Sequence, residues 1–204
     1  MRPTTDACGR WFLAGYWGIR RLACHCFRTS PGLEFFIMKT LFLLRHAKSS
    51  WGESQLRDFE RPLAARGLSD VKAMGRRFAD QGRQVQCIIC SPAVRTKTTA
   101  LLFAKAIGFP RDDIAANPEL YFAGAPMFLK ATSLLDEEYE SAMLVGHNPA
   151  ITEFVNDMCK ADIENIPTCG LVELRLPVQY WAEADYGNAE LVDFDYPKLH
   201  REDD

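Results

Sequence analysis

Short apolar runs alternate along the chain with longer segments in which apolar residues recur every three or four positions. The run at 40–44 is continuous and bounded by charged residues, which is typical of a strand buried on both faces of a parallel sheet. Residues 85–90 and 142–146 show the same pattern and predict two further strands. The segments 171–176 and 190–194 alternate apolar and polar residues, which predicts strands with one exposed face.

Helices are predicted between these strands. The first lies between Gly67 and Gly82, where apolar residues form one stripe at helical spacing. Ser91 and Pro92 should begin the second helix as its cap and first helical residue, and Gly108 should end it. Two more helices are expected, one over about 125–135 and one from residue 148. Strands that alternate with helices predict an α/β fold, a three-layer α/β/α sandwich around a mostly parallel central sheet.

Residues 1–37 differ in character from the rest of the chain. They contain five Arg against two acidic residues and show no clear hydrophobic period. Their apolar stretch at 11–19 is far shorter than the roughly 20 residues that span a bilayer, and no small-residue cleavage site follows it. The Arg excess fits an organellar transit peptide, whereas the single Ser does not. We therefore expect residues 1–37 to be a disordered N-terminal extension or a wrongly assigned start, and residues 38–204 to form the domain.

The composition narrows the function classes. The chain has 204 residues, 48% of them hydrophobic, enough for one substantial core, and its net charge of −3 offers no basic surface for nucleic acid. Seven Cys, an odd number, indicate a reducing, cytoplasmic setting rather than a disulfide framework. Cys87 and Cys90 form a CxxC inside a predicted strand, so core packing is expected rather than redox chemistry or zinc binding. HExxH, Asp-rich loop and P-loop sequences are absent, and we expect no cofactor, no metal, no membrane association, and a monomer or weak dimer.

Polar side chains follow three of the predicted strands. Arg45 and His46 follow the first strand, Arg95 comes soon after the second, and His147 directly follows the strand that ends at Gly146. Ligands of such sheets bind beyond the carboxyl ends of the strands. We therefore expect two His and two Arg to converge on one edge of the sheet.

This combination of side chains suits a phosphoryl group. Such a group carries two negative charges, and its transition state spreads charge over the equatorial oxygens, so a site must supply fixed positive donors. Arg45 and Arg95 offer planar forks for bidentate contact with phosphate oxygens. A neutral imidazole is a competent nucleophile, and His46 is the candidate to form a phosphohistidine that divides hydrolysis into two displacements. His147, at a predicted helix start, should stabilise charge.

Five motifs, in order, resemble the histidine phosphatase superfamily and, within it, the compact SixA-like phosphohistidine phosphatases. They are Leu-Leu-Arg45-His46-Ala-Lys, Arg61-Pro62-Leu-x-x-x-Gly67, Ser91-Pro92-Ala-x-Arg95-Thr, Glu119-Leu-Tyr and Val-Gly146-His147-Asn148-Pro149. The resemblance covers about four fifths of the chain, from Met38 to the C-terminal strands. It implies a phosphoglycerate mutase-like fold, a metal-independent phosphatase reaction, and Glu119 as the acid that protonates the leaving group. Asp58 is the alternative proton donor.

Other candidates surround the nucleophile. Lys48, Ser49, Asp58 and Arg61 are expected to contact phosphate or substrate, and Asn148 to bind substrate or orient its loop. A domain this short has few elements to close over a ligand, and an open site favours phosphohistidine on a protein over a small phosphorylated substrate. Two other functions stay open, a phosphoglycerate mutase-type phosphotransferase and a non-catalytic phospho-ligand binding protein.

Overall fold

The computed structural model describes residues 38–50, 56–122 and 124–201, and these contain a six-stranded sheet. Its strands are β1 (Lys39–Arg45), β2 (Cys87–Cys90), β3 (Ile114–Ala116), β4 (Ser141–Gly146), β5 (Leu171–Leu176) and β6 (Glu190–Asp195). Their order is β3-β2-β4-β1-β5-β6, in which the first four are parallel, β5 is antiparallel to β1, and β6 is antiparallel to β5. The predicted, mostly parallel sheet is confirmed, whereas the predicted extension at 1–37 lies outside the described residues.

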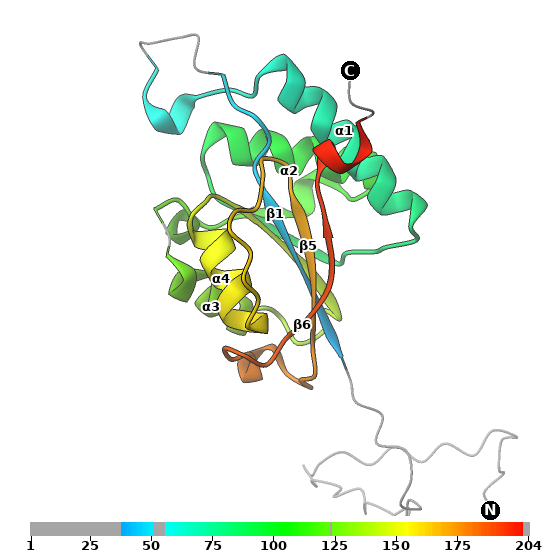
Figure 1. The fold of residues 1–204 in the computed structure, drawn as a ribbon, viewed down its shortest axis with the longest axis vertical. Coiled ribbons are helices and arrows are strands. Elements are labelled where there is room, and N and C mark those ends of the chain that lie inside the picture. The colour runs from blue at the N-terminus through cyan, green and yellow to red at the C-terminus, as the bar shows by residue number, and fades with distance from the viewer. Residues whose placement is uncertain (1–37, 51–55, 123, 202–204) are drawn as a thin grey trace, which may run out of the picture. The chain divides into compact units, whose positions relative to one another are not determined.

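Within the described residues, four α-helices accompany the sheet: α1 (Ala65–Asp80), α2 (Val94–Ile107), α3 (Ala125–Ser133) and α4 (Ala150–Cys159). The first two cover one face of the sheet and the last two cover the other (Figure 1). In β1, Phe42 and Leu44 pack toward α1 and α2, whereas Leu41 and Leu43 pack toward α3 and α4. Burial of each such side chain stabilises the fold by about 1.5–3 kcal/mol. The predicted three-layer α/β/α sandwich is confirmed.

Short 3-10 helices lie in the connections. They are η1 (Asp58–Glu60), η2 (Arg111–Asp113), η3 (Pro118–Leu120), η4 (Trp181–Glu183) and η5 (Pro197–His200). Two of them, η1 and η3, carry residues of the site described below. In the described part of the chain, every helix is too short or too polar to serve as a membrane span.

The start of α2 and the exposure of β5 differ from the predictions. Helix α2 begins at Val94 rather than at the predicted Pro92, and its cap is Ala93 rather than Ser91, because the Ser91 amide still donates to the carbonyl of Val145 in the sheet, at 2.9 Å. β5 is more buried than predicted, because it lies between β1 and β6, and on its polar face only the Arg175 side chain stays partly accessible. Its polar residue Glu173 is buried against Arg83, at 3.0 Å, which compensates the carboxylate. The short strand β3 was not predicted.

Lys39 is buried at the end of the sheet where β1 begins. Its ammonium donates to the carbonyls of Glu137 and Tyr139, at 3.0 and 2.8 Å, and to the Glu140 carboxylate at 3.2 Å. The Trp181 indole donates to the same Tyr139 carbonyl at 2.8 Å. Lys39 in β1 therefore supplies hydrogen-bond donors to the acceptors of the loop that leads into β4.

We expect Lys39→Met to lower the free energy of unfolding by about 3 kcal/mol, because the buried ammonium is lost together with its hydrogen bonds to the Glu137 carbonyl and the Glu140 carboxylate. Urea unfolding followed by circular dichroism measures this loss. Arg57→Met is the matched control, since Arg57 forms an exposed ion pair with Glu60 and its loss should leave the urea midpoint unchanged. Equal effects of the two variants would contradict the role given to Lys39.

Candidate active site

The carboxyl ends of three adjacent strands place His46, Ser91 and His147 side by side. In the sheet, Arg45 is opposite Gly146, and Cys90 is opposite Val145. The amide of His46 donates to the Gly146 carbonyl at 3.0 Å, which extends the pairing of β1 with β4 by one residue. As a result, the rings of His46 and His147 lie with their centroids 5.1 Å apart, as predicted from the strand ends.

The His46 ring is held uncharged and with a defined tautomer. Its Nδ1 lies 2.8 Å from the carbonyl oxygen of Ala47, which can only accept, so Nδ1 carries the proton and Nε2 keeps its lone pair. Burial lowers the pKa of His46 to about 4, and the positive charges of Arg95, Arg45 and Arg61 act in the same direction, against the Ala47 carbonyl. At neutral pH the ring therefore has one unprotonated nitrogen, Nε2.

The His147 ring is also neutral. Its Nε2 lies 2.8 Å from the Ser91 hydroxyl, and its Nδ1 accepts from the Arg95 guanidinium at 3.3 Å. Burial lowers its pKa to about 3, with further lowering by His46 and Arg95. Because a guanidinium only donates, Nε2 must carry the proton and donate to Ser91. The charge-stabilising role of His147 stays a prediction, and in the free protein this imidazole is uncharged.

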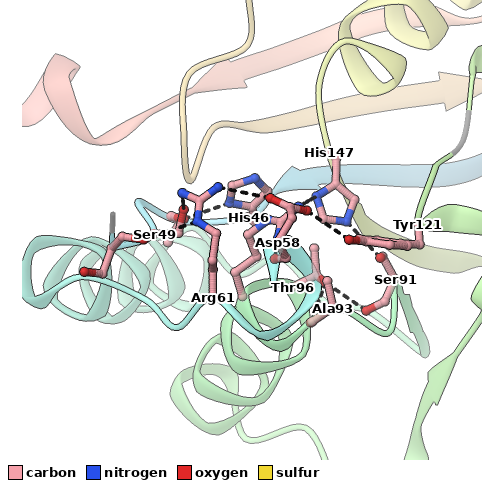
Figure 2. Close-up of polar contacts among 12 residues, drawn as sticks. His46, Ser49, Asp58, Arg61, Ser91, Ala93, Thr96, Tyr121 and His147 are labelled. Carbon is pink, nitrogen blue, oxygen red and sulfur yellow. Dashed lines mark hydrogen bonds and ion pairs between the residues drawn. The ribbon is translucent and has the colours of Figure 1, made fainter. Parts of the chain in front are cut away.

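Asp58 joins the cationic groups of the site (Figure 2). Its carboxylate accepts from Arg95 at 2.9 Å, from Arg61 at 3.1 Å and from the Tyr121 hydroxyl at 2.9 Å. Arg61 also donates to the Ser49 hydroxyl at 2.8 Å. Burial acts to raise the pKa of Asp58, but the hydrogen bonds from Tyr121 and Arg95 outweigh it and lower the pKa, so the carboxylate is ionised.

Arg45 is held by a separate group of amides. Its Nη1 donates to the Ile166 carbonyl at 2.6 Å and to Asn165 Oδ1 at 3.3 Å. Asn148 donates to the same two oxygens, at 3.1 and 2.9 Å. Among the described residues, the buried atoms Arg45 Nε and Asn148 Oδ1 have no hydrogen-bond partner. Asn148 therefore helps to orient the loop around Arg45.

Two predicted residues lie apart from this cluster of contacts. Lys48 is exposed, and its carbonyl packs so close to Gly67 that a Cβ there would approach the oxygen to 2.3 Å. Both carboxylate oxygens of Glu119 accept from Lys130 at the surface, at 2.9 Å. The hydrogen bonds of the Glu119 carboxylate thus go to Lys130, and its role as proton donor stays a prediction.

Three residues that contact the site were not predicted to belong to it: Ser91, Tyr121 and Asn165. Ser91 was interpreted as a helix cap, Tyr121 only as part of a motif, and Asn165 was not singled out. The position of Ser91 directly after β2, matching His46 after β1, could have pointed to it. Tyr121 and Asn165 come from connections, where no periodic pattern marks them. In the described part of the chain, no group of three His, Cys, Asp or Glu side chains could hold a metal ion.

Known proteins resemble this chain in sequence and in fold. The sequence pattern of the family described as the histidine phosphatase superfamily (branch 1) matches residues 41–121. The structure of the putative phosphohistidine phosphatase SixA from Agrobacterium tumefaciens is 30% identical, covers 78% of this chain and 98% of its own, and superposes with a TM-score of 0.65. An uncharacterized chloroplastic protein of Arabidopsis thaliana is also 30% identical, over 78% of this chain and 75% of that protein. SixA complexed with tungstate is 18% identical, covers 79% of this chain and 99% of its own with a TM-score of 0.68, and shares the fold.

We expect the protein to become less stable as pH falls below 6.5. The unfolded chain binds a proton at each histidine near that pH, whereas the folded protein binds one only near pH 4 at His46 and near pH 3 at His147. In this window the free energy of unfolding should fall by roughly 1.4 kcal/mol per pH unit for each histidine. Urea titrations from pH 7 to 5 on the wild type and His147→Asn measure the slope, which should be shallower in the variant. Equal slopes would contradict the depressed pKa of His147.

Proposed function

The chain belongs to the histidine phosphatase superfamily, and we propose that it hydrolyses a phosphorylated substrate through a covalent phosphohistidine at His46. The observation that carries this proposal is the state of the His46 ring. Its pKa is about 4, its Nε2 is unprotonated, its ring centroid lies 5.1 Å from that of His147, and the positive charges of three guanidiniums act on it. Positive charge attracts the phosphoryl dianion, while the neutral imidazole supplies the lone pair that attacks phosphorus.

The reaction consists of two displacements at phosphorus. In the first, the Nε2 lone pair of His46 forms a bond to phosphorus while the bond to the leaving group breaks, and the leaving group takes a proton from an acid. In the second, water attacks the phosphohistidine, the bond from phosphorus to Nε2 breaks, and the acid recovers a proton from the water. Arg45, Arg61 and Arg95 balance the charge on the phosphoryl oxygens in both transition states.

Asp58 fits the part of that acid better than Glu119. In the free protein its carboxylate is bound to Arg61 and Arg95, the groups that a phosphoryl dianion would also bind. A bound dianion competes for these hydrogens and places a like charge beside Asp58, which raises the pKa of the carboxyl and favours protonation. Asp58 is then a proton donor next to the leaving group. Glu119, paired with Lys130, lacks a comparable link to the phosphoryl site.

For the substrate, we propose a phosphohistidine on a protein. The solved relative with 30% identity is described as a putative phosphohistidine phosphatase, and an open site admits a phosphorylated side chain on a protein surface. Asp58, at the mouth of the site, is half-exposed, with 51% of its side chain accessible. An imidazole leaving group also needs little acid help, which suits a site whose carboxylate is ionised before substrate binds.

Labelling with radioactive phosphoramidate in buffer with EDTA tests the intermediate. We expect the wild type to form an adduct that is stable in base and labile in acid, as expected of phosphohistidine, and peptide mapping should place it at His46. His46→Ala should show no label. His200→Ala is the matched control, because His200 lies in η5, where it contacts Asp195 of β6, and its loss should leave labelling intact. A wild-type protein that binds phosphate but never labels would be a non-catalytic binding protein.

The identity of the acid can be tested with leaving groups of different basicity. We expect Asp58→Asn to lower kcat by about 10²-fold on phenyl phosphate and much less on p-nitrophenyl phosphate, whose leaving group needs less protonation. Steady-state kinetics on the two esters measures the difference. Glu119→Gln should change both rates by less than about twofold, because its carboxylate lies with Lys130. A leaving-group-dependent loss in Glu119→Gln instead would assign the acid to Glu119.

A further inference from the structure

Three aromatic rings form a continuous group at the surface, which we call the aromatic rim: Phe59, Tyr121 and Phe122. The ring centroids of Phe59 and Tyr121 are 5.1 Å apart, and those of Tyr121 and Phe122 are 4.1 Å apart. Phe122 is 90% exposed, more than any other large apolar side chain in the described part of the chain. Phe59 is 38% exposed. The rim therefore presents apolar surface that the protein's own packing leaves uncovered.

The local sequence holds this rim in place. The Asn117 side chain accepts from the Glu119 amide at 2.9 Å and caps η3, and the Tyr121 amide donates to the Pro118 carbonyl at 3.2 Å. Leu120 is buried and anchors the turn in the core. Tyr121 thus follows an anchored turn, and Phe122 packs its ring against Tyr121.

The aromatic rim borders the phosphoryl site. The Tyr121 ring lies 5.8 Å from the His147 ring, and its hydroxyl donates to Asp58, as Figure 2 shows. Phe59 directly follows Asp58 in η1. Whatever carries a phosphoryl group to His46 must therefore lie beside these rings.

We propose that the aromatic rim is the docking surface for the apolar protein surface that surrounds the phosphohistidine of a substrate protein. This inference rests on the proposed phosphatase function and specifies how its substrate is held. A small metabolite at His46 could reach Tyr121, but the outward-facing Phe122 ring needs a partner of protein size to leave water. Exposed apolar groups next to a functional site mark interaction surfaces, and aromatic rings there are typical binding hot spots.

Phe122→Ala tests the docking surface with two substrates that share a phosphorus–nitrogen bond. One is a four-helix-bundle protein phosphorylated at a surface histidine and purified, and the other is phosphoramidate, which has no surface to dock. We expect kcat/KM for the phosphorylated bundle to fall about tenfold through KM, a typical loss for a binding hot spot. The rate of Phe122→Ala on phosphoramidate should stay within about twofold of the wild type. Phe122→Trp should keep the wild-type kcat/KM for the phosphorylated bundle, because it retains an exposed aromatic ring.

Leu134→Ala is the matched control. Leu134 is 73% exposed but caps the C-terminal end of α3, next to the loop that leads into the start of β4, away from the carboxyl ends of the strands. This variant should act on both substrates as the wild type does. If the wild type hydrolyses phosphoramidate but either fails on the phosphorylated bundle or shows no dependence on Phe122, the rim is not a docking surface. If the wild type hydrolyses neither substrate, the proposed phosphatase function fails instead.

Discussion

The site depends on positive charge concentrated next to two imidazoles that are too buried to become charged themselves. The removal of water is the largest cause that favours the neutral form of both rings, and nearby guanidiniums act in the same direction, so the pKa values of His46 and His147 fall to about 4 and about 3. Cations gathered in this way repel each other unless an anion lies among them. Asp58 supplies that anion by binding Arg61 and Arg95 together. The proposed nucleophile, the guanidiniums and the proposed proton donor are therefore linked by their charges.

The sheet and its connections contribute different parts of this balance. His46, Ser91 and His147 follow adjacent strands, and the hydrogen bonds of β1 and β2 to β4 set their spacing. Asp58 and Tyr121 lie in or next to the short helices η1 and η3. The sheet thus positions the two imidazoles, while the connections supply Asp58 and Tyr121.

Most of the fold, and the centre of the site, could be predicted because buried strands leave a clear pattern. An apolar run followed at once by Arg45 and His46, or by His147, has no packing explanation, so the convergence of these residues was visible in the sequence. The hydrogen-bond partners of the carboxylates could not be predicted. The contacts of Asp58 with Arg95 and of Glu119 with Lys130 depend on how the connections between strands and helices pack. The burial of Glu173 in β5 could not be predicted either, because Arg83, which compensates its charge, comes from a distant part of the chain.

The bridge from Asp58 to Arg61 and Arg95 also bears on how a catalytic cycle ends. Inorganic phosphate leaves only when its hydrogen bonds to the guanidiniums are replaced, and in many sites solvent must do this. Here a tethered carboxylate stands next to the same donors and can take them over as the product departs. Under the proposed mechanism, the protein would carry its own competitor for the product, which would favour rapid turnover over tight retention of phosphate.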